Sequence, residues 1–164
     1  MVHAEMEYYF EQVALAIAQK AYKLWLDKRK ASTPLLSMVA YYSGSFPAIP
    51  DIHSANTSTS DIDWRTKEAF TSYNKYIRVG NHGIKEKNIL NIFLPIGIKI
   101  NEIDNNLLIE LNSFGAERGL IAYSSRIGAL SLTTPDDALK NVDTIMSYID
   151  SFDQYLYSYM IAMR

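Results

Sequence analysis

Apolar residues recur every three or four positions along most of the chain, which is the pattern of amphipathic helices. The first stripe predicts a helix over residues 3–30, and the last predicts a helix that runs from Thr134-Pro135 to the end of the chain. No segment alternates apolar and polar residues for long, so the pattern predicts no sheet. The first stripe consists of Met6, Phe10, Val13, Ile17, Ala21 and Leu24.

Capping residues and prolines mark where the other helices begin and end. Side-chain oxygens at a helix start accept hydrogen bonds from unpaired backbone N–H groups, and proline fits the first turn. The pattern predicts helices over residues 35–42 and 84–94, one that ends near Gly80, and one that starts after position 104. The expected start signals are Ser32-Thr33-Pro34, Asp63, Asp104 and Thr134-Pro135.

Residues 43–63 lack helical periodicity and contain Gly44, Pro47 and Pro50. They predict a long loop, and a loop of this length in a compact domain usually has a function. We hypothesise that it covers a functional groove. Together the elements predict one all-α domain over residues 1–164, with about four long helices and two or three short ones arranged as a bundle.

The composition of the chain excludes several classes of protein. The chain has 164 residues, no cysteine, and 16 basic against 18 acidic side chains. These counts exclude a disulfide framework, a thiolate metal site and a cysteine nucleophile, and they argue against a protein that coats nucleic acid. No apolar run approaches the roughly 20 residues of a membrane span, and the first residues do not resemble a signal peptide. We therefore expect a soluble, cytoplasmic domain with no membrane partner.

Common catalytic and metal-binding motifs are absent from the sequence. His3, His53 and His82 share no ligand spacing, so we expect neither a metal nor another cofactor. His82 lies in a predicted turn, where a local hydrogen-bonding role is favoured over a role as catalytic base. The 12 tyrosines are concentrated in the first and last predicted helices. There a core or interface role is favoured over stacking on bases.

One segment carries a family resemblance. Residues 111–125 contain Phe114-Gly115, then Arg118-Gly119, and then Ala-Tyr123-Ser. The segment resembles the HEPN superfamily of all-α ribonucleases, in the branch associated with RiboL and PSP domains. That branch carries a phenylalanine–glycine pair followed by Arg-Gly-x-x-Ala-His-Ser at the end of a long helix. Matching pieces occur in the same order at residues 7–11, 81–88, 95–98, 134–135 and 151–153, so the resemblance covers most of the chain.

The resemblance implies metal-independent RNA cleavage in a groove between two protomers of a homodimer. Arg118 would hold the scissile phosphate, and the residue at position 123 would be the general acid/base, leaving 2′,3′-cyclic phosphate ends. Arg126 and Lys140 would make the groove locally basic, and Glu117, Ser124 and Arg126 are second-tier site residues. The family also implies a bacterial defence or toxin–antitoxin system, with an antitoxin or defence protein as a further partner.

The sequence departs from the family where Tyr123 replaces the motif histidine. A tyrosine with a pKa of about 10 is roughly one part in a thousand ionised at pH 7, so it is a poor base. Three explanations stay open. The domain binds without cleaving, another group assists a weak activity, or Tyr123 replaces a histidine of the natural protein through a single-base change.

Helix geometry limits how the two motif residues cooperate. Five residues turn an ideal helix by about 500°, so Arg118 and Tyr123 point about 140° apart. Either the helix breaks near Gly119, or the two side chains converge only with those of a second chain. Without the resemblance a structural interpretation is favoured, in which Gly115 and Gly119 let helices approach closely and Arg118 pairs with an acid.

Two other functional classes remain beside the ribonuclease. One is a catalytically silent HEPN-like module that binds RNA, a nucleotide or a protein partner. The other is a purely structural helical subunit. A groove filled by aromatic side chains, with Arg118 paired away from it, would favour the structural class.

Overall fold

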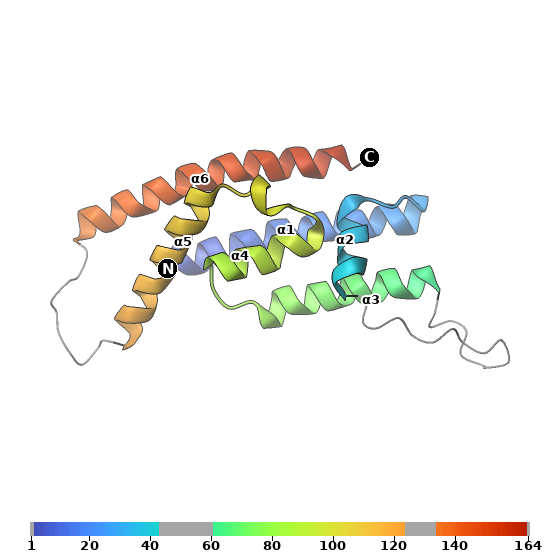
Figure 1. The fold of residues 1–164 in the computed structure, drawn as a ribbon, viewed down its shortest axis with the longest axis horizontal. Helices are drawn as coiled ribbons and strands as arrows, with labels where there is room; N and C mark the ends of the chain where they lie inside the picture. Colours follow the sequence, from blue (N-terminus) through green and yellow to red (C-terminus); the bar gives the residue numbers. More distant parts are fainter. Residues whose placement is uncertain (1, 43–60, 124–133, 164) are drawn as a thin grey trace.

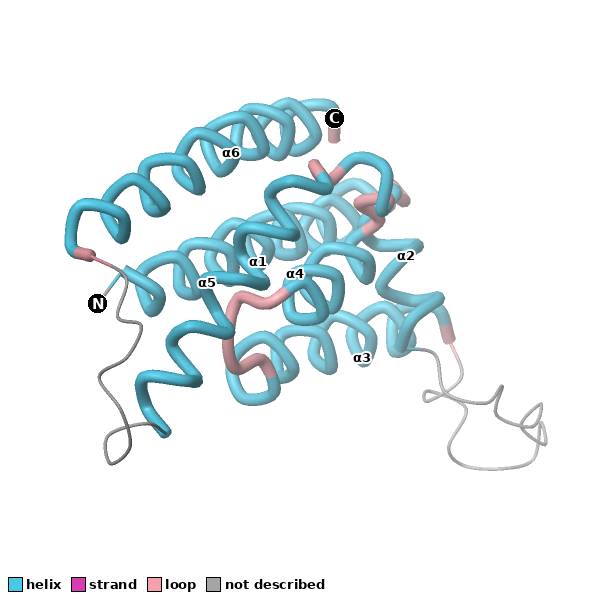
Figure 2. Tube along the Cα trace, turned by 60° about the vertical axis from the view of Figure 1, so that its left-hand side comes forward, coloured by secondary structure: helices cyan, strands magenta, loops and turns pink. Residues whose placement is uncertain are grey.

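The computed structural model describes residues 2–42, 61–123 and 134–163, and of residues 117–123 and 135 it describes only the backbone. All regular structure in these ranges is helical and no strand occurs in them (Figure 2), which confirms the predicted all-α class. A π-helical turn (Tyr76–Gly80) follows α3, and two 3₁₀ turns (Leu94–Ile96 and Ile100–Glu102) connect α4 to α5. The α-helices are α1 (Val2–Lys28), α2 (Thr33–Tyr42), α3 (Ile62–Lys75), α4 (Glu86–Phe93), α5 (Asn105–Tyr123) and α6 (Pro135–Ala162).

Helices α1 and α4 lie side by side in the middle of the molecule, between α6 on one side and α3 on the other (Figure 1). Helix α2 packs across α1 and α3 at one end, and α5 crosses at the other end, against α4 and α6. The N-terminal half of α6 extends past the other helices (Figure 1). One end of the bundle is therefore built from the start of α1, α5 and α6.

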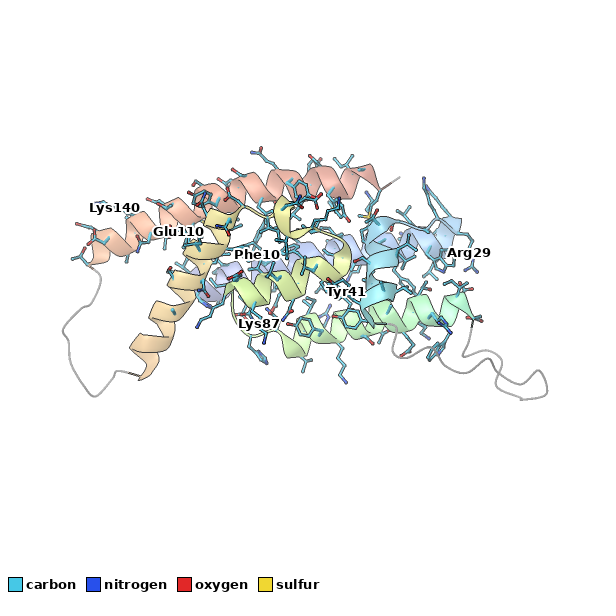
Figure 3. The ribbon with its side chains drawn as sticks, in the orientation of Figure 1. Phe10, Arg29, Tyr41, Lys87, Glu110 and Lys140 are labelled. Atoms are coloured by element: carbon cyan, nitrogen blue, oxygen red, sulfur yellow. The ribbon has the colours of Figure 1, made fainter. Side chains whose placement is uncertain are left out.

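The core is organised around aromatic rings from three helices. Phe10 of α1 is fully buried at the centre (Figure 3), and its ring meets Phe93 of α4 edge-to-face at a centroid distance of 6.0 Å. Phe93 in turn meets Phe152 of α6 at 5.0 Å. Burial of a large apolar side chain contributes about 1.5–3 kcal/mol, and edge-to-face pairs add to this. These rings therefore join α6 to the α1–α4 layer.

Most of the predicted helix boundaries are confirmed. Thr134 caps α6, its hydroxyl accepting a hydrogen bond from the Asp137 N–H at 3.2 Å. Asp104 starts α5, because its carboxylate accepts from the Asn106 N–H at 2.8 Å. Helix α4 starts at Glu86, two residues later than predicted, because Lys85 is extended with ψ 160°. None of the described helices is long and apolar enough to cross a membrane.

The predicted cap at Asp63 is wrong. Asp61 caps α3 instead, and its carboxylate accepts from the Trp64 N–H at 2.7 Å. Asp63 lies in the first turn of α3 and accepts from the Trp25 indole N–H at 2.9 Å and from the Arg29 guanidinium. The Asp63 carboxylate therefore joins α3 to α1 and does not cap α3.

The predicted loop over residues 43–63 is too long at its C-terminal end, because positions 61–63 form the cap and first turn of α3. Residues 43–60, and with them the hypothesis of a groove cover, lie outside the described part of the chain. Helix α1 ends at Lys28 rather than near position 30. Arg29 has φ 55°, and the N–H groups of Arg29 and Lys30 donate back to the last turn of α1 in the manner of a helix C-cap.

Candidate functional site

The sequence-predicted site residues are concentrated at the C-terminal end of α5. Glu117, Arg118 and Tyr123 belong to α5, where only the backbone is described, and Ser124 and Arg126 lie outside the described residues. The backbone of α5 is helical from Asn105 to Tyr123, with no break at the glycine at position 119. The motif is therefore presented on a continuous helix.

A buried asparagine organises the turn before α4. Asn81 is 3% exposed, and its side-chain amide donates to Glu11 Oε1 of α1 at 2.9 Å. Its Oδ1 accepts from the side-chain amide of Asn88 at 3.2 Å, and Asn88 also donates to the His82 carbonyl at 3.3 Å. A buried polar group must find partners of this kind to be tolerated. The network ties the turn to both α1 and α4.

Glu7 extends this network toward the N-terminus of α1. Its Oε1 accepts from the backbone N–H of Gly83 at 2.7 Å, and its Oε2 lies 3.7 Å from Nδ1 of His3. Gly83 has φ +118°, a conformation that a side chain would strain. A glycine at this position therefore lets the turn present its N–H to the carboxylate.

The Phe114-Gly115 pair of α5 packs directly on these residues. The imidazole of His3 stacks on the Phe114 ring, with 6.2 Å between centroids and 24° between planes, and His3 is only 8% exposed. A Cβ added to Gly115 would lie 2.9 Å from Cγ of Lys85 and 3.9 Å from Nε2 of His3. A side chain at position 115 would displace the Lys85 chain, so glycine suits this contact.

We call this group the polar cluster. It places the imidazole of His3 and the side chain of Lys85 against Phe114 and Gly115, one turn before position 118 of α5. Such groups can transfer a proton and bind an anion. The members of the polar cluster are His3, Glu7, Glu11, Asn81, Lys85 and Asn88.

Helical register separates the two motif positions. Position 118 follows Phe114 by four residues and Gly115 by three, so its backbone lies on the α5 face that packs on the polar cluster. Position 123 follows Asn112 by eleven residues and Ala116 by seven, and both of these are exposed. Its backbone therefore lies on a different face of α5, the one that carries Asn112 and Ala116.

The side chains of the remaining histidine and lysine candidates, His82 and Lys140, are exposed. The side chain of His82 is exposed, and its backbone carbonyl accepts from Asn88. Lys140, proposed for a basic groove, is exposed near the start of α6 (Figure 3), and its Nζ lies 4.0 Å from Asp137. Within the described residues, no group of three histidine, aspartate or glutamate side chains could hold a metal ion.

Several tyrosines of α1 and α6 have the predicted core role. Tyr9 donates to the Asp153 carboxylate and joins α1 to α6, and the Tyr159 hydroxyl donates to the Ile96 carbonyl at 3.0 Å. Burial, helped by the nearby carboxylate of Glu102, raises the pKa of Tyr159 to about 12. Its hydroxyl therefore stays protonated and donates at neutral pH.

Sequence reasoning missed the roles of His3 and Glu7. The available signal was their spacing of four residues in a predicted helix, which places an imidazole and a carboxylate on one face. Their meeting with Phe114 across more than 100 residues of chain has no local signature. Comparison of the chain with protein-family models, with curated proteins and with solved structures gives no match.

Proposed function

We propose that this chain is one subunit of a homodimeric, metal-independent endoribonuclease of the HEPN type. The observation that carries the proposal is the packing of Phe114-Gly115 on the polar cluster. The two residues that begin the motif form a tight contact, and the contact fixes the turn of α5 that leads to Arg118. This contact supports the proposal because position 118 follows it by one turn of α5.

In the proposed reaction the 2′-hydroxyl of the RNA attacks the adjacent phosphorus and the 5′-oxygen leaves, giving a 2′,3′-cyclic phosphate. Arg118 binds the phosphate through two parallel hydrogen bonds and stabilises the charge that develops on it. Tyr123 donates a hydrogen bond from its neutral hydroxyl but accepts a proton poorly at pH 7. The cleavage activity of this chain is therefore lower than that of the same chain with histidine at position 123.

A second copy of the chain completes the site in this proposal. Because α5 is continuous, positions 118 and 123 face about 140° apart, and one chain cannot direct both side chains into one pocket. The exposed part of α6 offers an apolar surface for the partner: Leu139 is 63% exposed and Met146 is 42% exposed, with half-buried Val142 between them. These residues continue the stripe that buries Ile149 further along the helix.

We propose a cytoplasmic enzyme, and the family resemblance supports a role in a bacterial defence or toxin–antitoxin system. An antitoxin or defence protein would then be a further partner. The presence of Tyr123 where the family motif has histidine favours a second candidate function. In that case the chain is a catalytically silent module that binds RNA, a nucleotide or a protein through the same surface.

The test compares RNA cleavage by the parent chain, by Tyr123→His, and by Tyr123→His combined with Arg118→Ala. We expect the histidine variant to cut about 10²–10⁴ times faster than the parent, with EDTA present and with cyclic phosphate ends. The added Arg118→Ala change should abolish cutting without loss of fold. Arg78→Ala is the matched control, since Arg78 is exposed and donates to Asn74, which lies one turn back on the same helical segment.

A different outcome would refute the proposal. If every form is folded and dimeric and none cuts a mixed RNA pool, the ribonuclease proposal is wrong. Fluorescence anisotropy with labelled RNA then tests the binding module, and an Arg118-dependent affinity would identify RNA as its ligand.

A further inference from the structure

A cavity of about 240 Å³ lies at the end of the bundle that carries α2 and the C-terminal turns of α6, away from α5 (Figure 1). It is lined by the connection between α1 and α2 and by the last turn of α6 with Met163. The connection turns across this end of the bundle because Arg29 has a left-handed conformation with φ 55°. Sites for drug-sized ligands measure roughly 300–1,000 Å³, so this cavity suits a smaller molecule.

Tertiary contacts fix the position of the cavity wall. The hydroxyl of Tyr159, which lines the cavity, donates to the Ile96 carbonyl at 3.0 Å. A Cβ added to Gly97 would lie 2.9 Å from Oη of Tyr159 and 3.0 Å from Cγ2 of Thr33. Glycine at this position therefore lets α6 and the start of α2 approach each other, and the cavity lies between them.

Ser32 contributes a buried hydroxyl to the cavity. It is the N-cap residue of α2, since its carbonyl accepts from the Leu36 N–H at 3.0 Å. A serine at this position normally accepts a hydrogen bond from the first turn through its side chain. The Oγ of Ser32 is buried instead and bonds to no group in the described part of the chain. Because buried polar atoms are almost always paired, a partner for this hydroxyl is expected from outside the chain.

The charge around the cavity has one sign. Lys30 lines it and is exposed, and the start of α2 adds the partial positive charge of a helix N-terminus. Among the described residues that line the cavity, none is acidic, and Pro34, Tyr159 and Met163 give it apolar walls. One cation beside apolar walls suits a singly charged anion with an apolar body, whereas a phosphate dianion would call for a second cation.

We infer that this cavity is a binding site for a small organic carboxylate with an apolar body. The ammonium group of Lys30 and the hydroxyl of Ser32 donate to the carboxylate, and rotation about the Cα–Cβ bond brings the hydroxyl to it. The apolar body of the ligand contacts Pro34, Met163 and the ring of Tyr159. The site is separate from the α5 motif and does not depend on the proposed ribonuclease activity.

The experiment is a titration of the full chain, labelled with ¹⁵N, followed by two-dimensional NMR. The probe is sodium benzoate, and sodium chloride at equal ionic strength is the reference. We expect saturable shifts of the amide signals of residues 30–33 and 159–163, with a dissociation constant of about 1 mM for a ligand of this size. Benzyl alcohol has the same ring without the charge and should bind about tenfold more weakly.

Substitutions test the two polar groups and the space between them. Lys30→Gln and Ser32→Ala should each raise the dissociation constant of benzoate by about three- to tenfold, because each removes one hydrogen bond to the carboxylate. Lys28→Gln is the matched control, since Lys28 is exposed and does not line the cavity. Ala162→Leu fills the cavity without changing the charge and should abolish binding.

Each outcome decides the assignment. Saturable benzoate binding that weakens in Lys30→Gln and not in Lys28→Gln supports the site. Equal affinity for benzoate and benzyl alcohol overturns the carboxylate assignment on the parent chain alone, also in the case that a variant does not fold. Shifts that follow ionic strength without saturation mean an adventitious ion only, and saturable binding of inorganic phosphate in place of benzoate means a site for an inorganic anion. Both results overturn the inference, and neither bears on RNA cleavage.

Discussion

The Glu7 carboxylate accepts a hydrogen bond from the backbone N–H of Gly83 at 2.7 Å, although the two residues are 76 positions apart. The bond joins the first turns of α1 to the turn that precedes α4. Because Gly83 has φ +118°, the turn that makes this contact requires glycine. The polar cluster beside α5 is consequently assembled by folding and exists in neither segment alone.

Loss of this bond should cost measurable stability. We expect Glu7→Ala to lower the free energy of unfolding by about 1.5–3 kcal/mol, the range for a hydrogen bond to a charged group. Glu7→Gln keeps an acceptor and should cost less. Urea unfolding followed by far-UV circular dichroism measures both. Glu5→Ala, a change of the same kind at an exposed position of α1, should fall within about 0.5 kcal/mol of the parent.

A second stability prediction concerns Tyr73 of α3. This side chain is fully buried, and its hydroxyl donates to the Ile92 carbonyl of α4 at 2.9 Å. Burial raises the pKa of Tyr73 well above its ordinary value, so the hydroxyl remains a donor over the whole accessible pH range. Tyr73→Phe should therefore lower the free energy of unfolding by about 1–2 kcal/mol. Tyr41→Phe, at an exposed tyrosine, is the control, and equal effects of the two changes would contradict the assignment.

The pH dependence of stability should carry a signature of Asp63. Hydrogen bonds from Arg29 and from the Trp25 indole hold the pKa of this carboxyl below its ordinary value of about 3.9. Since the pKa is lower in the folded state, the contact stabilises the fold above that pH. This contribution is lost as the pH falls through the folded-state value.

The corresponding measurement is the melting temperature of the parent and of Asp63→Asn between pH 2.5 and pH 6. We expect the parent to melt higher at pH 6 and the difference to shrink below about pH 4. Asp27→Asn, at an exposed aspartate near the end of α1, should show no such pH-dependent gap. A constant gap for Asp63→Asn would show that its charge is not what stabilises the α1–α3 contact.

The helices could be predicted from the sequence because their signals are local. Apolar residues that recur with a period of 3.6 already define the buried face of α1, where Met6, Phe10, Ile17 and Ala21 are buried as expected. Capping is local too, as Thr134 shows. Asp63 was wrongly predicted as the cap of α3 because two aspartates, Asp61 and Asp63, lie close to the start of this helix and either could accept hydrogen bonds from its first N–H groups. The actual place of the Asp63 carboxylate depends on side chains of α1.

The candidate site was predictable only in part. The motif on α5 is contiguous and could be found by resemblance, whereas the polar cluster joins residues 70 or more positions apart, such as Glu11 and Asn81. Nothing in the local sequence around His3 indicates that it meets Phe114. The Phe114-Gly115 pair acquires a physical reason only when its partners in the fold are known, namely the imidazole of His3 and the side chain of Lys85.

The last prediction concerns the interface of the proposed homodimer. If the exposed stripe on the N-terminal half of α6 contacts a second copy, a charge in that stripe must be buried without a partner on assembly, which is costly. Leu139→Glu should therefore shift the protein from dimer to monomer, as measured by light scattering after size-exclusion chromatography. Tyr157→Glu adds the same charge to an equally exposed residue near the other end of α6 and should leave the dimer intact. A parent protein that is monomeric at every accessible concentration would refute the composite site, and cleavage by a monomeric Leu139→Glu variant would show that one chain suffices.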